Sequence, residues 1–437
     1  MEQYLGYIIS PLNNEESIES VRLIKSEDNI EIEFSANSHH QLNIATIHGS
    51  FTGLGDVTLI NCKNIGMSTG SGGYQKKYSA EYLLVGDYIS NLNEKTFDSI
   101  KIEMPGLLGW TKISGIKNDF FATRTVTTED VPNVILYSSD QYTVELYSVV
   151  NYSFKRQNNE VSLKEDIGLK VQAQNKSLSV LDFLEHIVEF QKLFFIIGNT
   201  SSELGKVTLN NEKEFSTQLF WKGKRSLGDP SINNPSLKYN DILPNIIDIV
   251  SNWISKREIH TSIDLILEKS INAKLSIENY FLNNCFAIET FHRRFKNFRI
   301  FDQQEFKTIK EEILKSVEND EIREILSNNL AHINEPNFRR RLIDFSEDFG
   351  NVLPKDFQID SFITQTVKTR NFLVHRSSEK NIFTKFEMLY ATIFIEIIVK
   401  INIYRVLGIE EDLIKKSLIH AGGNTISMYE YNKSFQF

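Results

Sequence analysis

A short stretch near the C-terminus, TRNFLVHR at residues 369–376, sets an arginine and a histidine into an apolar run. Buried polar groups are costly unless they are paired or used, so Arg370, Asn371 and His375 are the first candidates for a functional role. An imidazole can give or take a proton near neutral pH because its unperturbed pKa is about 6.5. A guanidinium binds phosphate oxygens through its planar fork. Acid–base catalysis and phosphate binding are therefore the chemistry that these side chains could perform.

The periodicity predicts a helix from about residue 360 to 375, which decides which side chains share a face. Its core-facing stripe consists of Ile363, Val367, Arg370 and Val374. Asn371 and His375 are four residues apart, so they share a face on which the amide can orient the imidazole. Arg370 and His375 point about 140° apart in a regular helix, so one helix does not bring both to one atom. Two copies related by a two-fold axis would bring both pairs to a shared cleft.

The composition is that of a folded protein with several domains. With 437 residues, 41% of them hydrophobic and 11% aromatic, the chain has material for two or three packed cores. Cys62 and Cys285 lie far apart and outside any CxxC pair, which argues against a disulfide framework or a zinc cluster and favours a reducing, cytoplasmic environment. The most hydrophobic stretch is interrupted by Glu396 and Lys400, so we expect a buried helix and no membrane span.

Two basic clusters contrast with the net charge of −9. FHRRFKNFRI at 291–300 carries four fixed positive charges and no acid, and FRRRL at 338–342 adds three. Such clusters are commonly solvated helix faces, but a local basic patch can hold phosphate on an acidic protein. The sequence leaves both interpretations open.

The chain divides into a β-rich part and a helical part. Residues 1–225 contain short runs of alternating hydrophobicity separated by glycine-rich turns, which predicts a sandwich- or barrel-like antiparallel domain. A polar segment with Gly and Pro at 226–244 is the expected linker. From 245 to 437 nearly every segment has a helical period. The predicted fold class is therefore α+β multidomain, with an all-α helical bundle in the C-terminal part.

Two helices have clear boundary signals. One is expected near 179–198 inside the β-rich part, with Ser179 and Asp182 at its start. The other is the long apolar helix from about residue 382 to 407, which Gly408 ends.

Several segments resemble one known family. The spacing Arg-Asn-x-x-x-His, present as RNFLVH, resembles the signature of HEPN-domain ribonucleases, small helical bundles that dimerise across the motif helix. CFAIETFHRRF is similar to the second-helix segment of the ApeA-like HEPN branch. ATIHGSFTGLGDVTLINC and LLGWTKISG resemble the β-rich ApeA N-terminal domain, so the resemblance covers most of the chain.

The resemblance implies a metal-independent ribonuclease of a bacterial antiphage, abortive-infection system. RNA carries its own nucleophile, the 2′-OH, so such an enzyme aligns it with the phosphate, moves protons and neutralises charge. In these terms His375 is the acid or base, Arg370 is the phosphate clamp and Asn371 is the positioning residue. We expect unpaired RNA as the substrate, a 2′,3′-cyclic phosphate and a 5′-hydroxyl as product ends, and no metal or cofactor. The resemblance further implies a homodimer or higher two-fold oligomer, and a phage-derived trigger on the N-terminal domain.

The family's helix segment also carries over residues outside the motif. Glu289 and His292 lie three apart on one helix face and correspond to residues that support the site or form a secondary one. Arg293, Arg294 and Arg376 are expected to guide RNA.

Each assignment has a structural alternative. His375 could be a hydrogen-bonded packing histidine, and Arg370 could form a buried salt bridge with Glu289; for Glu289 this alternative is the stronger one. The chain as a whole could be a catalytically inactive HEPN scaffold that dimerises and binds RNA or nucleotide without turnover. Two short motifs carry no assignment, because DFG at 348–350 lacks the other kinase elements and the His39–His40 pair lacks metal-ligand partners.

Overall fold

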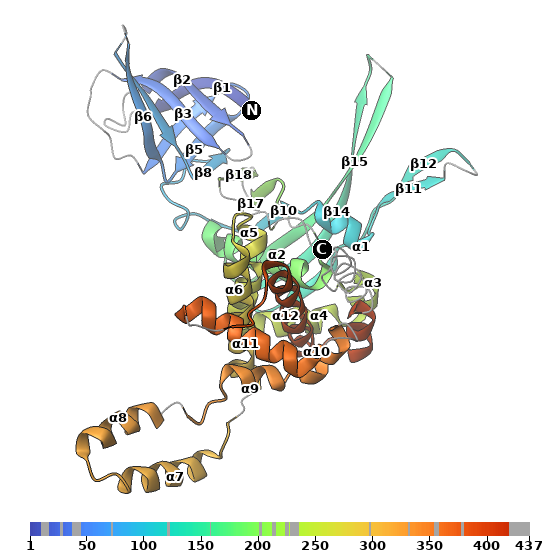
Figure 1. The fold of residues 1–437 in the computed structure, drawn as a ribbon. Helices are drawn as coiled ribbons and strands as arrows, with labels where there is room; N and C mark the ends of the chain where they lie inside the picture. Colours follow the sequence, from blue (N-terminus) through green and yellow to red (C-terminus); the bar gives the residue numbers. More distant parts are fainter. Residues whose placement is uncertain are drawn as a thin grey trace, which may run out of the picture. The chain divides into compact units, whose positions relative to one another are not determined.

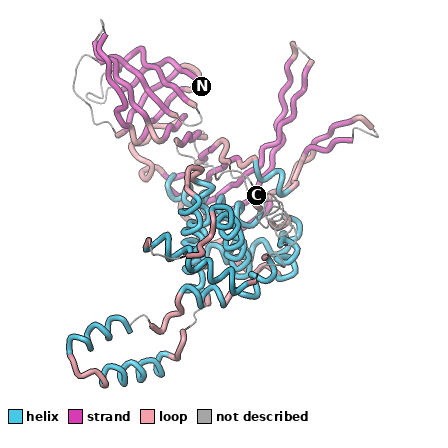
Figure 2. The backbone as a smooth tube through the Cα atoms, viewed as in Figure 1, coloured by secondary structure: helices cyan, strands magenta, loops and turns pink. Residues whose placement is uncertain are grey.

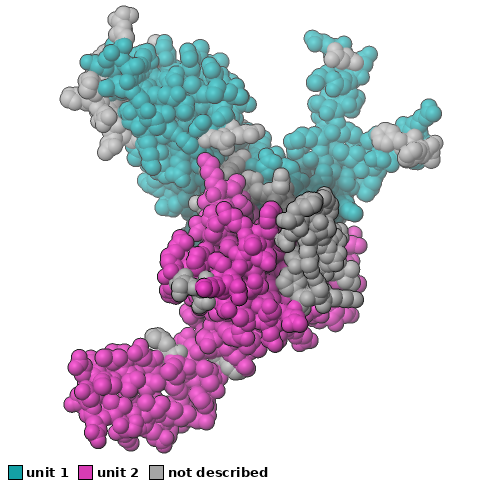
Figure 3. Space-filling model, viewed as in Figure 1, with its two compact units in different colours: residues 1–195, 200–227 teal, residues 196–199, 228–437 magenta. Residues whose placement is uncertain are grey.

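A computed structural model describes most of the chain. The described residues are 1–9, 17–26, 29–36, 45–70, 73–119, 123–157, 159–200, 203–211, 216–222, 227, 236–296, 299–330, 333–353, 358–376 and 380–418. They fall into two compact units, unit 1 with residues 1–195 and 200–227 and unit 2 with residues 196–199 and 228–437 (Figure 3). Of the predicted linker at 226–244, residues 226 and 228–235 lie outside the described residues.

Unit 1 consists mainly of antiparallel strands, drawn magenta in Figure 2, and 14 of them form one sheet. In spatial order these are β13 (Val134–Ser138), β14 (Tyr142–Lys155), β15 (Glu160–Ala173), β10 (Ser99–Glu103), β17 (Val207–Asn210), β18 (Thr217–Trp221), β8 (Tyr82–Val85), β5 (Gly55–Ile60), β4 (Thr46–Phe51), β1 (Glu2–Ile9), β2 (Ser17–Lys25), β3 (Ile30–Ala36), β7 (Gly73–Ser79) and β6 (Lys63–Gly70). β3 is one of the runs of alternating hydrophobicity expected in residues 1–225, with Ile30, Ile32 and Phe34 buried on one face. Phe34 stacks on Tyr78 of β7, with ring centroids 5.7 Å apart, in the hydrophobic core of this part of the sheet.

Two β-ribbons extend from the region around β10. β14 and β15 pair along their whole length, from Tyr142 opposite Ala173 to Lys155 opposite Glu160. β13 and β10 flank only the half of this pair that begins at Tyr142, so among the described residues the other half is a two-stranded ribbon (Figure 1). The second ribbon is formed by β11 (Ile116–Asp119) and β12 (Thr125–Thr128). Shorter elements of unit 1 are α1 (Gly106–Thr111), β9 (Thr96–Phe97) and β16 (Leu178–Ser179).

The helix predicted near 179–198 is confirmed as α2 (Val180–Gly198). Its first turn is capped as the sequence indicates. The Ser179 hydroxyl accepts a hydrogen bond from the Asp182 backbone N–H at 3.3 Å, and the Asp182 carboxylate accepts one from the Ser179 N–H at 3.0 Å.

Unit 2 is helical, drawn cyan in Figure 2. Its described helices are α3 (Tyr239–Ile242), α4 (Ile246–Ser255), α5 (His260–Ile271), α6 (Ile277–Phe295), α7 (Gln303–Lys315), α8 (Asp320–Leu330), α9 (Phe338–Ile343), α10 (Ser346–Val352), α11 (Ile359–His375) and α12 (Lys385–Val406), with a further helical segment at 411–418. The predicted fold class, a β-rich N-terminal part followed by an all-α bundle, is confirmed.

The core of unit 2 is built around α12. Between Met388 and Tyr404 nearly every side chain is buried, as expected for a helix that is apolar all round. Thr384 and Glu387 form a capping box at its start, and Gly408, with a φ of +83°, follows its end. Among the described helices, none combines the length and the apolar composition that crossing a lipid bilayer requires.

Candidate functional site

The motif residues lie in the last two turns of α11. This helix packs against α6 and α9 (Figure 1), and its buried residues are Phe362, Ile363, Thr366 and Thr369. The predicted apolar stripe is therefore partly wrong: Val367 and Arg370 lie at the margin of the buried face, and Val374 is exposed. Packing against the neighbouring helices selects a face that is rotated away from the one that periodicity alone indicates. The rotation leaves Arg370 partly open to solvent.

Arg370 is held between side chains of α6 and α9. Its guanidinium carbon lies 6.0 Å from the ring centroid of Phe286 and 5.7 Å from that of Phe338. One carboxylate is near, with Arg370 Nη2 at 3.9 Å from Glu289 Oε2, and the side chain is 21% exposed. Its Nε is buried without a hydrogen-bond partner among the described residues. The guanidinium is thus oriented by aromatic contacts and only loosely paired, which leaves it able to bind an anion.

Asn371 contacts the arginine of the motif. Its side-chain oxygen accepts a hydrogen bond from Arg370 Nη1 at 3.3 Å, and the described residues contain no hydrogen bond between Asn371 and His375. The amide is therefore placed to orient the guanidinium, whereas the sequence suggested that it would orient the imidazole.

His375 is exposed at the C-terminal end of α11. It makes no hydrogen bond or ion pair within the described part of the chain. In a regular helix it lies about 7.5 Å along the axis from Arg370 and about 140° around it. In the described residues the two side chains share no hydrogen bond or ion pair, and their divergence on one helix stays a prediction. Arg376 follows in a left-handed conformation, with a φ of 51°, and donates its N–H to the Phe372 carbonyl.

His292 occupies a different environment from His375, because it is only 1% exposed. Its Nε2 lies 2.8 Å from Asp344 Oδ2, and its Nδ1 lies 3.3 Å from Arg341 Nη1. A guanidinium can only donate, so Nδ1 accepts and Nε2 carries the proton that it donates to Asp344. Burial is the main cause that lowers the pKa of His292, and the Arg341 charge adds to it. His292 is thus a buried neutral imidazole that supports the helix packing and does not face a substrate.

An alternating chain of charges links this buried cluster to the motif arginine. Arg341 is buried and donates to the Pro336 carbonyl at 2.9 Å, and its Nη2 lies 3.4 Å from Glu335. Arg293 lies between Glu335 and Glu289, at 3.8 Å and 3.6 Å. Glu289 then contacts Arg370, so each of the three arginines in this series of charges has a carboxylate beside it.

The three arginines of the second basic cluster, FRRRL at 338–342, all have partners within the fold. In FRRRL, Arg341 is buried, Arg340 pairs with Asp344 at 3.4 Å, and Arg339 donates to the Thr364 hydroxyl at 2.7 Å. The interpretation of this run as a phosphate-binding patch is wrong for Arg341, whose charge is used inside the fold.

The surface arginines predicted to guide RNA lie at the ends of α6 and α11. Arg293, Arg294 and Arg376 are exposed, and Arg294 and Arg376 form no ion pair in the described ranges. Residues 297 and 298 of the first basic cluster lie outside the described residues. No group of three or more His, Cys, Asp or Glu side chains in the part of the chain that the structure describes is placed to hold a metal ion.

Comparison with protein families supplies the context for this geometry. Residues 4–253 match the model of ApeA N-terminal domain 1, and residues 282–413 match that of the Apea-like HEPN domain. The second match spans all of α11 and the part of α6 that carries Glu289 and His292. No curated protein and no solved structure shows significant similarity to the chain. The two matches confirm the resemblance expected from the sequence: the chain belongs to the ApeA family, with ApeA N-terminal domain 1 followed by an Apea-like HEPN domain.

Proposed function

We propose that this chain is a metal-independent endoribonuclease that cleaves single-stranded or loop RNA and acts in antiphage abortive infection. The observation that supports it most is that one helix of an Apea-like HEPN domain presents a loosely paired guanidinium, Arg370, and an exposed imidazole, His375. A positioned cation and a proton-transfer group are what attack by the ribose 2′-OH on its own phosphodiester requires.

In the proposed reaction His375 transfers the proton that leaves the 2′-OH or joins the departing 5′-oxygen. Arg370 binds the non-bridging phosphate oxygens and stabilises the charge that grows on them in the transition state. Asn371 keeps the guanidinium in place through its hydrogen bond to Nη1. The RNA supplies the nucleophile, so the product ends are a 2′,3′-cyclic phosphate and a 5′-hydroxyl. Arg293, Arg294 and Arg376 attract the backbone of the RNA.

The active form in this proposal is a homodimer or a higher two-fold oligomer. Arg370 and His375 diverge on one helix, so two α11 helices around a two-fold axis would place the arginine of one copy near the histidine of the other. Val374 within the motif and Phe386 in the first turn of α12 are large exposed apolar side chains, which a dimer interface could cover.

The division of labour follows the predicted domains. We assign recognition of a phage-derived trigger to residues 1–225, a connecting role to 226–244, and RNA cleavage to 245–437, in the cytoplasm of the host cell.

The alternative, an inactive HEPN scaffold that dimerises and binds RNA or nucleotide, draws support from one observation. Arg370 lies between two aromatic rings and beside Glu289, as a structural arginine would. In that case replacing Arg370 lowers the melting temperature. Neither the parent nor any variant then cleaves RNA.

Purified parent, His375→Ala and Arg370→Ala, incubated with end-labelled single-stranded RNA and a metal chelator, provide the test. Arg257→Ala, an exposed arginine of unit 2 away from α11, is the matched control. We expect His375→Ala to lower the cleavage rate by about 10²–10⁴-fold with an unchanged melting temperature and oligomeric state. Arg257→Ala should cut like the parent, with cyclic-phosphate ends. If His375→Ala cuts at the parental rate, the assignment fails.

A further inference from the structure

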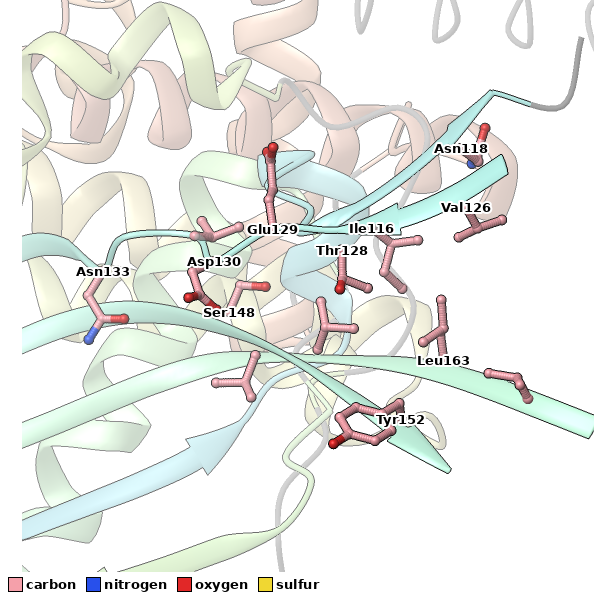
Figure 4. Close-up of a pocket in the computed structure, with 14 residues that line it drawn as sticks. Ile116, Asn118, Val126, Thr128, Glu129, Asp130, Asn133, Ser148, Tyr152 and Leu163 are labelled. Carbon is pink, nitrogen blue, oxygen red and sulfur yellow. The ribbon is translucent and has the colours of Figure 1, made fainter. Parts of the chain in front are cut away.

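Two β-ribbons of unit 1 face each other across a groove of about 1120 Å³. The β11–β12 ribbon contributes Ile116, Asn118, Val126 and Thr128, and the β14–β15 ribbon contributes Ser148, Val150, Tyr152, Val161 and Leu163. Figure 4 draws the lining residues as sticks, with Ile116 and Thr128 of one ribbon and Leu163 of the other in the space between the ribbons. None of the residues that line the groove belongs to the motif helix, which is part of unit 2.

The strand registers explain why apolar side chains meet in this groove. Ile116 pairs with Thr128 on one ribbon, and Tyr152 pairs with Leu163 on the other. Cross-strand partners lie on the same face, so most strand residues that line the groove, Val149 excepted, come from one face of each ribbon. Two sheets that pack directly bury such inner faces, at a spacing of about 10 Å.

These inner faces are not buried against each other. Val126 is 43% exposed, Val161 64% and Tyr152 82%. Contiguous exposed apolar surface of this kind usually marks an interaction site. The two ribbons therefore resemble the two sheets of a β-sandwich that are held apart, with exposed inner faces and no described segment between them.

The root of the groove is fixed by a carboxylate. Glu165 of β15 accepts hydrogen bonds from the Gly115 N–H at 2.6 Å and from the Ser114 and Ser148 hydroxyls, each at 2.7 Å. Burial opposes ionisation, but these three hydrogen bonds lower the pKa of Glu165, so the carboxylate stays charged at neutral pH. The bonds tie the segment that leads into β11 to the β14–β15 ribbon, next to the lining residue Ser148.

A close backbone approach supports the same conclusion. A Cβ on Gly115 would lie 2.5 Å from the Glu129 carbonyl oxygen and 3.0 Å from Val150 Cγ2. Only glycine allows the chain to pass between the ribbons at this point. The spacing of the two faces is thus set by the fold.

The shape and the charge of the groove define what it can hold. Its volume of about 1120 Å³ exceeds the roughly 300–1,000 Å³ of small-molecule pockets. A longer ligand, such as a strand segment of about 5–6 residues, suits such a volume. The β-branched and aromatic lining suits the alternating side chains of an extended chain. The charged lining residues are Glu129 and Asp130. Lys117 pairs with Glu129 at 3.0 Å, whereas Asp130 forms no ion pair among the described residues.

We propose that the groove binds an extended peptide segment of another protein, with alternating apolar side chains between the ribbons and a lysine or arginine at Asp130. Among the described residues, the β11–β12 ribbon and the outer half of the β14–β15 ribbon have unpaired strand edges, at which a bound peptide can form backbone hydrogen bonds while its side chains contact the lining. The binding site itself does not depend on ribonuclease activity. Its use as the input for a trigger rests on the proposed function.

Fluorescence anisotropy with the full-length chain tests this directly. The probe is a labelled nine-residue peptide of alternating threonine and valine with a lysine at each end, and the comparison peptide has glutamate ends. Val126→Glu and Val161→Glu place a charge on opposite walls, and Ile135→Glu on β13, which is exposed and outside the lining, is the matched control. All three positions are exposed, so the fold should survive each change. Asp130→Lys reverses the charge that selects the peptide.

We expect saturable binding of the lysine-ended peptide, at least tenfold weaker binding by either wall variant, and parental binding by Ile135→Glu. Asp130→Lys should shift the preference to the glutamate-ended peptide. Absence of saturable binding, or equal losses in Ile135→Glu and the wall variants, overturns the proposal. So does an unchanged preference in Asp130→Lys. If no peptide binds but Val126→Glu splits an oligomer of the parent in size-exclusion chromatography, the groove is a contact between copies. None of these measurements uses RNA, so an inactive nuclease would not affect them.

Discussion

Arg370 Nη2 lies 3.9 Å from Glu289 Oε2, a distance at which the carboxylate orients the guanidinium without a close hydrogen-bonded pair. Phe286 and Phe338 hold the planar group from the sides. A phosphate that approaches Arg370 therefore meets a guanidinium that Glu289 orients without a close pair, and whose donors remain able to bind it. The contact between α6 and α11 thereby helps to set the orientation of the Arg370 guanidinium.

In the proposed ribonuclease, replacing Glu289 by Gln should reduce RNA cleavage, because Arg370 loses the charge that orients it, and should leave the fold nearly unchanged. Partly exposed ion pairs contribute about 0–1 kcal/mol, so the free energy of unfolding should change by no more than that. A loss of about 1 kcal/mol in the transition state lowers the rate by roughly fivefold. Single-turnover cleavage and chemical denaturation of Glu289→Gln, beside Glu311→Gln on α7 as control, measure the two effects. A drop in stability with parental cleavage would assign Glu289 to packing alone.

Local signals in the sequence predicted much of the fold. The Ser179–Asp182 start of α2 and the Gly408 end of α12 depend on side chain–backbone contacts within a few residues, which sequence reasoning can identify. The bounds of α11 followed from an apolar period that no glycine or proline interrupts. The family resemblance rested on contiguous segments, and the family matches confirm it.

What sequence reasoning missed depends on contacts between distant residues. His292 lies 52 positions from Asp344 and 49 from Arg341 along the chain, so no local pattern reveals that it is buried and neutral. The orientation of α11 depends on its packing against neighbouring helices, whose positions the apolar period of α11 cannot predict. The facing β-ribbons likewise need the relative placement of β12 and β14, which strand alternation alone does not give.

The buried His292 should make the protein less stable in mild acid. Its pKa is lowered in the folded state, so below about pH 6.5 the unfolded chain binds a proton that the folded chain does not. The contribution of neutral His292 to the free energy of unfolding is therefore fully present above that pH, and it is lost as pH falls toward the folded-state pKa. Protonation would also place a hydrogen on Nδ1, against the Arg341 donor. Denaturant midpoints of parent and His292→Gln between pH 8 and 5 measure the effect.

The difference between the two proteins isolates this histidine, because other histidines titrate in both; the pKa of His48, for instance, is also lowered by burial. We expect the stability gap between parent and variant to narrow steadily as pH falls. A constant gap across the whole range would contradict the neutral assignment of His292.

Both cysteines should be inert in the folded protein. Burial raises the pKa of the Cys62 thiol to about 12 and that of Cys285 further still, and the thiolate is the reactive form. Titration with a disulfide reagent at neutral pH should detect no reactive thiol in the native chain and two in denaturant. Rapid reaction of one thiol without denaturant would show that its surroundings open easily.

The ion pair inside α12 should show strong non-additivity. Lys400 is fully buried, its Nζ lies 3.0 Å from Glu396 Oε1, and the Tyr280 hydroxyl donates to the other oxygen of that carboxylate. Burial lowers the pKa of Lys400, and the nearby carboxylate opposes that shift. Glu396→Gln alone leaves a buried cation without its counter-charge, which costs about 3–5 kcal/mol. The amide still accepts the Tyr280 hydrogen bond, so the loss reports on the charge.

Combining Glu396→Gln with Lys400→Met removes both buried charges and retains the acceptor for Tyr280. We expect the double variant to unfold within about 1 kcal/mol of the parent, because replacing a whole buried pair is often neutral. Guanidinium unfolding is followed by helical circular dichroism, which reports chiefly on unit 2. It gives the free energy of unfolding of the parent, of each single variant and of the double variant, which together form a double-mutant cycle. A coupling energy above about 2 kcal/mol would agree with the geometry, and additive losses would mean that water reaches the pair.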